Sequence, residues 1–65
     1  MLQLYDVVAL NRDDLQHGVK KGQKGTVIDI LENGEAYTVE FVDENGETVE
    51  QALFTEYEEK DLELL

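Results

Sequence analysis

Residues 26–54 read TVIDILENGEAYTVEFVDENGETVEQALF, and the tetrapeptide Glu-Asn-Gly-Glu occurs in them twice, at 32–35 and at 44–47. Asn-Gly between apolar stretches is the strongest short-range signal for a two-residue hairpin, because both residues tolerate the positive φ that a type I′ turn requires. We therefore expect positive φ at Gly34 and Gly46. The sequence predicts two successive hairpins that join strands over 26–31, 36–42 and 48–54.

The two turns also predict how these strands pair. If each Asn-Gly forms a two-residue loop, Ile30 lies opposite Tyr37 and Phe41 lies opposite Glu50. Directly opposed residues share a face of a sheet. The two pairings, assigned independently, then agree on one nearly continuous apolar face, which consists of Thr26, Ile28, Ile30, Tyr37, Val39, Phe41, Ala52 and Phe54 with Glu50 at its end. We expect this face to form the core.

The rest of the chain supplies a cover for that face. Residues 5–10 are rich in β-branched and apolar side chains and predict a strand. Residues 11–23 predict a long polar loop, and the charged run 55–61 suits one 3₁₀ turn before a short closing strand at 62–65. We expect residues 1–65 to form a single all-β domain, a small five-stranded barrel, since closure removes exposed strand edges.

One local motif lies outside the turns, Lys21-Gly22-Gln23-Lys24-Gly25-Thr26-Val27. Its Gly-x-x-Gly-x-Val pattern resembles the start of a strand in SH3-like barrels of the KOW type. With Asp6-Val7-Val8-Ala9-Leu10 and Tyr37-x-Val39-Glu40-Phe41-x-Asp43-x-x-Gly46-Glu47-Thr48, the chain resembles short bacterial proteins catalogued as domain of unknown function 4926. The resemblance covers nearly the whole chain and implies an SH3-like barrel with a long first loop. It implies no catalytic residues.

The charge is large and uneven. The chain holds 16 Asp and Glu against 5 Lys and Arg, which gives a formal net charge of −11. Residues 1–32 hold five acids and four bases, whereas residues 33–65 hold eleven acids and Lys60 as the single base. An acidic protein is a poor ligand for anionic membranes and for nucleic-acid phosphates. We therefore expect neither a membrane nor a nucleic acid as partner.

The chain lacks the residues that several classes of enzyme use for catalysis. The chain has no Cys and no Ser, so the common nucleophiles, disulfides and thiolate zinc sites are absent. His17 is the single imidazole and lies in a polar loop. If Gly46 is matched to the glycine of a calcium-binding loop, Phe41 and Ala52 fall at ligand positions. Neither side chain can bind calcium. We predict a non-enzymatic cytoplasmic protein with no catalytic residues, no cofactor and no metal.

Two other binding surfaces are possible from the sequence. Arg12, Lys20, Lys21 and Lys24 would make one basic edge for a phosphate or RNA, although they also balance the acidic half of the chain. Five aromatic residues would suit a groove for proline-rich peptides, but the predicted register buries three of them.

The acidic half favours a protein-binding module for a basic protein, such as an inhibitor of the antitoxin or immunity type. Tyr57, Leu53 and Val49 are the apolar anchors that we expect to be exposed. The alternative is an accessory subunit or a structural homo-oligomer; in isolation we expect a monomer or a weak homodimer. The predicted partner-binding residues are Asp43, Glu44, Glu47, Glu56, Tyr57, Glu58 and Glu59.

Overall fold

The computed structural model describes all of residues 1–65 and contains β-strands joined by short 3₁₀ turns. The strands are β1 (Val7–Leu10), β2 (Lys24–Leu31), β3 (Ala36–Phe41), β4 (Glu56–Tyr57) and β5 (Leu62–Leu64). The turns are η1 (Leu15–His17), η2 (Glu32–Gly34), η3 (Glu50–Ala52) and η4 (Glu59–Asp61). The predicted all-β class is confirmed. The structure contains no helix that is long and apolar enough to cross a membrane.

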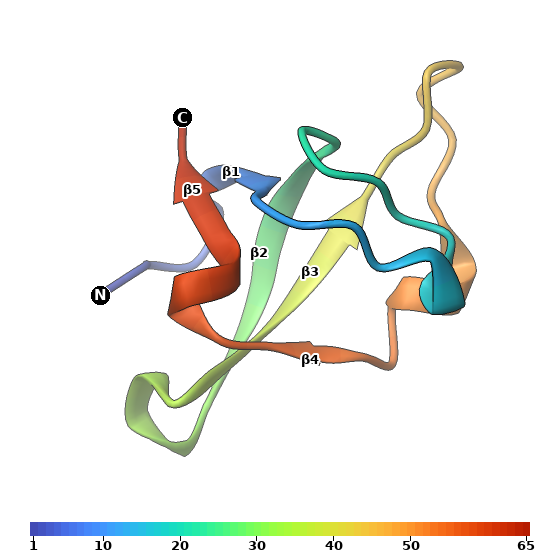
Figure 1. Cartoon of the computed structure of the whole chain (residues 1–65). Helices are drawn as coiled ribbons and strands as arrows, with labels where there is room; N and C mark the ends of the chain where they lie inside the picture. Colours follow the sequence, from blue (N-terminus) through green and yellow to red (C-terminus); the bar gives the residue numbers. More distant parts are fainter.

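The five strands form one antiparallel sheet in the spatial order β4-β3-β2-β1-β5. The sheet curls into a half-barrel, and β4 runs into β5 through η4 at the lower left of Figure 1. The curled sheet encloses the core. It also brings the start of β1 and the C-terminal end of the chain together, where the Leu65 N–H donates to the Val7 carbonyl at 3.0 Å.

β2 and β3 form the first predicted hairpin. Ile30 lies opposite Tyr37, as predicted, and the pair Leu31–Ala36 closes the loop. Gly34 has φ 101°, which confirms the predicted positive φ. Glu32 also has positive φ, at 51°, so the loop spans four residues rather than the predicted two.

A β-bulge in β2 exchanges the predicted faces of Val27 and Ile28. The register shifts between Val27 and Asp29, so that Val27, and not Ile28, lies opposite Val39. Since a bulge places one extra residue in a strand, the side chains before it change face. Val27 is therefore fully buried and Ile28 is 39% exposed, which corrects the prediction that Ile28 belongs to the core.

The second hairpin has a different turn from the one predicted. The Gly46 N–H donates to the Asp43 carbonyl at 2.9 Å, and the Asp43 N–H donates to the Glu47 carbonyl at 2.8 Å. The Asp43 carboxylate also accepts the N–H groups of Asn45 and Glu47, each at 2.9 Å. Gly46 has the predicted positive φ, 81°, but Asn45 does not. The loop is therefore a three-residue turn that ends on a left-handed glycine.

The extra loop residue shifts the second pairing by one position. Val42 bridges Thr48, and the Val49 N–H donates to the Phe41 carbonyl at 2.8 Å. A shift of one residue exchanges the two faces of a strand. Val49 is therefore half-buried against the core, whereas Glu50, the predicted partner of Phe41, is exposed.

The predicted strand over 48–54 does not form. The chain turns through η3, and pairing with β3 resumes at β4, where Tyr57 lies opposite Tyr37. Phe54, predicted to be in the core, is 93% exposed, and Tyr57, predicted to be exposed, is fully buried. The two aromatic residues have thus exchanged roles, because η3 interrupts the segment and pairing with β3 resumes with Tyr57, and not Phe54, opposite Tyr37.

Tyr57 and Phe41 pack edge to face at the centre of the core, with ring centroids 5.3 Å apart and an interplanar angle of 81°. This is a favourable arrangement for two aromatic rings. The buried apolar residues around them come from β1, β2, β3 and β5, from η3 and from the segments that hold Leu2 and Val19. They are Leu2, Val8, Leu10, Val19, Val27, Tyr37, Val39, Ala52 and Leu62.

The two glycines of the Lys21–Val27 motif have different functions. Gly22 has φ 90° and open space around its Cα, so it serves the turn. A Cβ on Gly25 would lie 2.6 Å from Val39 Cγ1 and 2.9 Å from the Glu40 carbonyl oxygen. Gly25 therefore allows β2 and β3 to approach closely and does not shape the turn.

Replacing Phe41 with alanine should lower the free energy of unfolding by about 3–5 kcal/mol, because the change empties a fully buried ring site. Phe54→Ala is the matched control, and it should change stability by less than about 0.5 kcal/mol because the ring is exposed. Urea unfolding followed by circular dichroism measures both. A loss for Phe54→Ala as large as that for Phe41→Ala would show that the shifted register is wrong.

Candidate functional site

The largest hollow in the structure has a volume of about 820 Å³ and an acidic lining. It lies between η2, β4 and η4, at the lower left of Figure 1. Five carboxylates line it, together with two cations and one apolar side chain. These residues are Glu32, Glu35, Glu56, Glu58, Asp61, Arg12, Lys60 and Ala36.

The alternation of β4 explains why its two glutamates line the hollow. Successive side chains of a strand point to opposite faces, so Glu56 and Glu58 point outward while Tyr57 between them is buried. The β3–β4 register pairs Glu56 with Thr38, and its continuation brings Glu58 next to Ala36 at the start of β3. The loop before β3 then adds its own glutamates to the same hollow.

Asp61 and Arg12 close one side of the hollow and tie η4 to the segment after β1. Arg12 Nε donates to Asp61 Oδ1 at 3.0 Å, and the Glu58 N–H donates to Asp61 Oδ2 at 3.0 Å. Asp61 therefore caps η4 and binds Arg12 at the same time. Two bonds from the neighbouring segment reinforce this junction: Asn11 donates to the Asp61 carbonyl through its N–H, at 2.8 Å, and to the Lys60 carbonyl through its side-chain amide, at 2.7 Å.

Behind the hollow, Tyr57 connects β4 to the first loop. Its hydroxyl donates to Asp14 Oδ2 at 2.8 Å, and His17 Nδ1 donates to the same oxygen at 2.8 Å. Arg12 lies over the Tyr57 ring, 5.8 Å from its centroid. The first loop is thus held to the core by a partly buried polar network, together with the buried Val19, whereas Leu15 in the same loop is 66% exposed.

Burial and hydrogen bonding shift the pKa values of this network. Burial disfavours ionisation of Asp14, but hydrogen bonds from Tyr57 and His17 outweigh it and lower the pKa of Asp14 below its ordinary value of 3.8. Burial likewise opposes ionisation of Asp61, and the Arg12 hydrogen bond reverses the effect, so its pKa is also lowered. Burial and the bond to Asp14 raise the pKa of Tyr57 above 10.0. Both carboxylates are therefore ionised and Tyr57 is protonated at neutral pH.

The free carboxylates define what the hollow can bind. Glu32, Glu35 and Glu56 make neither an ion pair nor a side-chain hydrogen bond, whereas Glu58 pairs with Lys60 at 3.3 Å. The carboxylates do not converge closely enough to hold a metal ion, because no group of three or more suitable ligands is formed. An open, wide set of carboxylates instead suits ammonium and guanidinium groups, which make charge-assisted hydrogen bonds.

The structure brings together only part of the predicted partner-binding set. Glu56 and Glu58 line the hollow. Glu59 lies in η4, where it pairs with the N-terminal amine at 3.3 Å and accepts the Tyr37 hydroxyl at 3.3 Å. Tyr57 is fully buried and cannot contact a partner, which corrects its prediction as an anchor.

The other three predicted residues, Asp43, Glu44 and Glu47, lie in the second hairpin, at the upper right of Figure 1 and far from the hollow. Asp43 and Glu44 face Lys20, Lys21 and Lys24 across a second hollow of about 540 Å³. Arg12 is absent from this hollow because it pairs with Asp61. The four bases therefore do not form the single basic edge that the sequence suggested.

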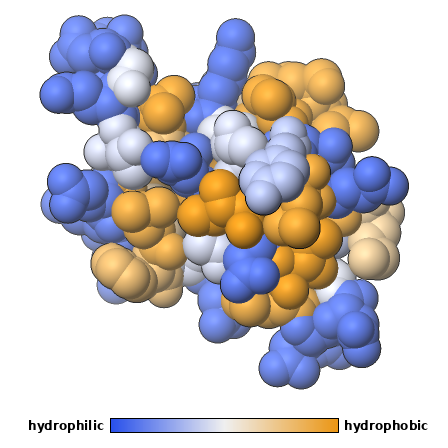
Figure 2. All heavy atoms as spheres, turned by 180° about the vertical axis from the view of Figure 1, so that it is seen from behind, coloured by the Kyte–Doolittle hydropathy of each residue, from blue (hydrophilic) through white to orange (hydrophobic).

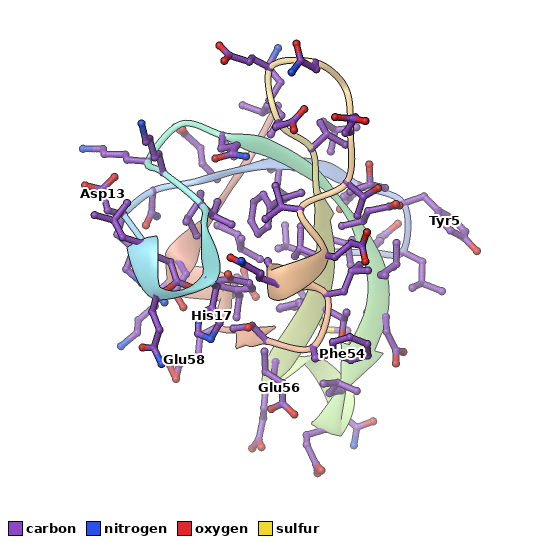
Figure 3. All side chains as sticks on the ribbon, turned by 90° about the vertical axis from the view of Figure 1, so that its right-hand side faces the viewer. Tyr5, Asp13, His17, Phe54, Glu56 and Glu58 are labelled. Carbon is purple, nitrogen blue, oxygen red and sulfur yellow. The ribbon has the colours of Figure 1, made fainter.

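Sequence reasoning missed three exposed residues that belong near the site. Glu32 and Glu35 were interpreted only as turn residues, although the repeated Glu-Asn-Gly-Glu places a carboxylate on each side of the turn. Phe54 was assigned to the core. Figure 3 shows Phe54 on the same side of the molecule as Glu56, close to the strand that lines the hollow. The apolar pattern contains no signal that separates Phe54 from Tyr57, because each fits a strand.

Stability should depend on pH through Asp61. Because its folded pKa is lowered, the stabilisation is fully present above the unfolded pKa, near 3.8, and is lost as pH falls through the folded pKa. Asp61→Asn should therefore unfold more easily than wild type at pH 6, and the difference should shrink below about pH 4. Urea unfolding between pH 2 and 7 measures it, with Glu44→Gln at the hairpin tip as control. A difference that is equally large at pH 2.5 and at pH 6 would contradict the ion pair.

Comparisons with known proteins place the chain in a family but not in a functional class. The searches of the curated proteins and of the solved structures gave no match. The family model described as domain of unknown function DUF4926 matches residues 4–59, which is most of the chain. The match confirms the family resemblance carried by the strand and turn motifs, and the chain belongs to the DUF4926 family.

Proposed function

We propose that this chain is a non-enzymatic protein-binding module that recognises a basic protein through its acidic hollow. One observation carries the proposal: the hollow gathers five carboxylates with only two cations, and three of those carboxylates are unpaired. A partner that brings lysine or arginine side chains into the hollow would pair them. An inhibitor of the antitoxin or immunity type belongs to this class of protein.

Electrostatics would act mainly on the rate of association. The carboxylates of the hollow are hydrated, so each ion pair with a partner contributes little affinity. The summed field of a molecule with net charge −11 accelerates encounter with a basic surface, by about 10–10³-fold at low salt. Association should therefore slow steeply as salt is added.

Affinity needs an apolar contact in addition, and Phe54 is the candidate. The ring is 93% exposed and lies two residues from Glu56. Large aromatic side chains dominate the energetics of protein interfaces, whereas charges at the rim contribute mainly specificity. Phe54 is therefore the candidate for the exposed apolar anchor, the role that the sequence suggested for Tyr57.

The finer fold assignment belongs to the same proposal. The strand order β4-β3-β2-β1-β5, with η4 between β4 and β5, supports an SH3-like arrangement of the half-barrel. In this arrangement the hollow lies at the end of the sheet where the first hairpin meets η4 (Figure 1).

The test uses a synthetic peptide, Ac-GKRKGKRKG-amide, titrated into the labelled protein by NMR at 20 and 200 mM NaCl. We expect binding that weakens at least tenfold between the two salt concentrations. The variant Glu35→Gln/Glu56→Gln/Glu58→Gln removes three charges from the hollow and should weaken binding at least tenfold. The matched control, Glu44→Gln/Glu47→Gln/Glu50→Gln, removes three exposed charges outside it.

The control triple variant should weaken binding by no more than about threefold, through the change in net charge alone. If both triple variants weaken binding equally, the hollow is not a recognition site. Failure of the peptide to bind at 20 mM NaCl would also contradict the proposal.

A further inference from the structure

A second surface lies on the outer side of the sheet. It consists of Tyr5, Val7, Ile28 and Leu65, which we call the Tyr5 face. The β1–β2 register pairs Val7 with Thr26. Beyond it, the Tyr5 N–H donates to the Val27 carbonyl at 2.7 Å and the Val27 N–H donates to the Asp6 carbonyl at 2.9 Å, so Tyr5 is held beside the segment of β2 that contains Ile28. The β1–β5 register, with the bond from the Leu65 N–H to the Val7 carbonyl, places Leu65 on the other side of Val7.

All four side chains of the Tyr5 face are accessible. Their exposed fractions are 74% for Tyr5, 47% for Val7, 39% for Ile28 and 59% for Leu65. Figure 2, which views the molecule from behind Figure 1, shows apolar side chains gathered over this part of the sheet. Contiguous apolar surface of this kind on a small protein commonly marks an interaction site.

Tyr5 is held in a costly backbone conformation. Its φ is 70°, in a four-residue turn that is closed by the Asp6 N–H and the Gln3 carbonyl at 3.1 Å. The Asp6 carboxylate accepts the Gln3 N–H at 2.8 Å and secures the turn a second time. Glycine or asparagine usually occupies such a position, because a large side chain is strained there. The fold does not need the ring, since its side chain projects away from the molecule (Figure 3) and its hydroxyl makes no hydrogen bond within the chain.

The charges around the Tyr5 face indicate which partner fits it. None of its four side chains is charged. In the next row of the sheet Lys24 and Glu63 flank Ala9 with opposite signs, and Glu40 lies opposite Thr26, on the far side of Thr26 from Val7. A basic protein is drawn more strongly to the hollow, where five carboxylates gather. Two molecules of net charge −11 repel each other least when these faces meet.

We propose that the Tyr5 face binds a second copy of this chain in a weak two-fold dimer. A two-fold interface uses the same patch on both subunits, so each Tyr5 ring would pack against the apolar side chains of the other copy. The exposed parts of the four side chains amount to on the order of 400 Å² per copy, since a fully buried aromatic side chain alone contributes about 150–250 Å². An interface of this size is at the low end for specific complexes and predicts a reversible dimer.

Sedimentation equilibrium of the full chain, from 10 µM to 1 mM protein at 20 and 300 mM NaCl, tests the proposal. We expect a dissociation constant of roughly 0.1–1 mM at 300 mM NaCl. At 20 mM NaCl we expect the constant to be at least about threefold higher, because salt screens the repulsion between the copies. This salt dependence is opposite to the one expected for a basic partner.

Three variants locate the interface. Tyr5→Asn removes the ring and leaves a residue that tolerates positive φ, so the protein should melt at or above the wild-type temperature while its dimer weakens at least tenfold. Ile28→Thr should weaken the dimer at least fivefold. Leu15→Thr is the matched control, because Leu15 is 66% exposed but lies on η1, and it should change the dissociation constant by less than twofold.

Three results would overturn the proposal. A chain that stays monomeric at 1 mM in 300 mM NaCl has no such dimer. A dimer that Leu15→Thr weakens as much as Tyr5→Asn uses another surface. Concentration-dependent NMR shifts confined to η3 and β4, with none in residues 4–7 or 26–28, would also place the interface elsewhere.

Discussion

The hydrogen bond from the buried Tyr57 hydroxyl to Asp14 is the interaction on which the rest of this small fold depends. Tyr57 packs edge to face on Phe41, pairs across the sheet with Tyr37 and lies under Arg12. A buried hydroxyl without a partner is costly, so the ring can occupy the core only while Asp14 accepts a hydrogen bond from its hydroxyl. The same carboxylate accepts His17, and in this way one bond joins β4, the first loop and the core.

The position of Tyr57 also determines where the charges lie. Because it points inward, its two neighbours Glu56 and Glu58 point outward into the hollow, and the chain leaves β4 in the direction that lets Asp61 cap η4 and bind Arg12. A strongly acidic chain thus separates into an ordered, hydrogen-bonded network around Tyr57 and the unpaired carboxylates of Glu32, Glu35 and Glu56 in the hollow. Elsewhere on the outer side of the sheet, the four side chains of the Tyr5 face are uncharged. The proposed protein partner and the proposed second copy therefore use different surfaces and respond to salt in opposite directions.

The sequence predicts the parts of this structure that local chemistry controls. The Asn-Gly turns, the positive φ of Gly34 and Gly46, the pairing of Ile30 with Tyr37 and the 3₁₀ turn before the last strand all follow from residue type and spacing. The errors arise where one side chain changes the length of a loop. Asp43 binds two backbone N–H groups in a longer second turn, and the pairing that follows it is shifted by one residue. η3 then interrupts the predicted strand, so that Tyr57 takes the place in the core that was predicted for Phe54.

Part of the candidate site could be predicted from the sequence, namely the residues whose side chains point outward because side chains alternate along a strand. Glu56 and Glu58 were identified as partner-binding residues, but proximity in sequence to other acids also drew in Asp43, Glu44 and Glu47, which the second hairpin carries away from the hollow. The contribution of Glu32 and Glu35 depends on the β3–β4 pairing, and the pairing of Arg12 with Asp61 joins residues 49 positions apart. A single sequence contains no pattern that predicts either the β3–β4 pairing or the Arg12–Asp61 ion pair.

A double-mutant cycle between Tyr57→Phe and Asp14→Ala tests the central role of this hydrogen bond most directly. Each single change should lower the free energy of unfolding in urea, and the double variant should be more stable than the sum of the two losses implies. We expect a coupling energy of about 1–3 kcal/mol, as is typical for a buried bond to a charged group. If the two losses add to within about 0.3 kcal/mol, Tyr57 is not held by Asp14, and the arrangement of carboxylates around β4 must have another cause.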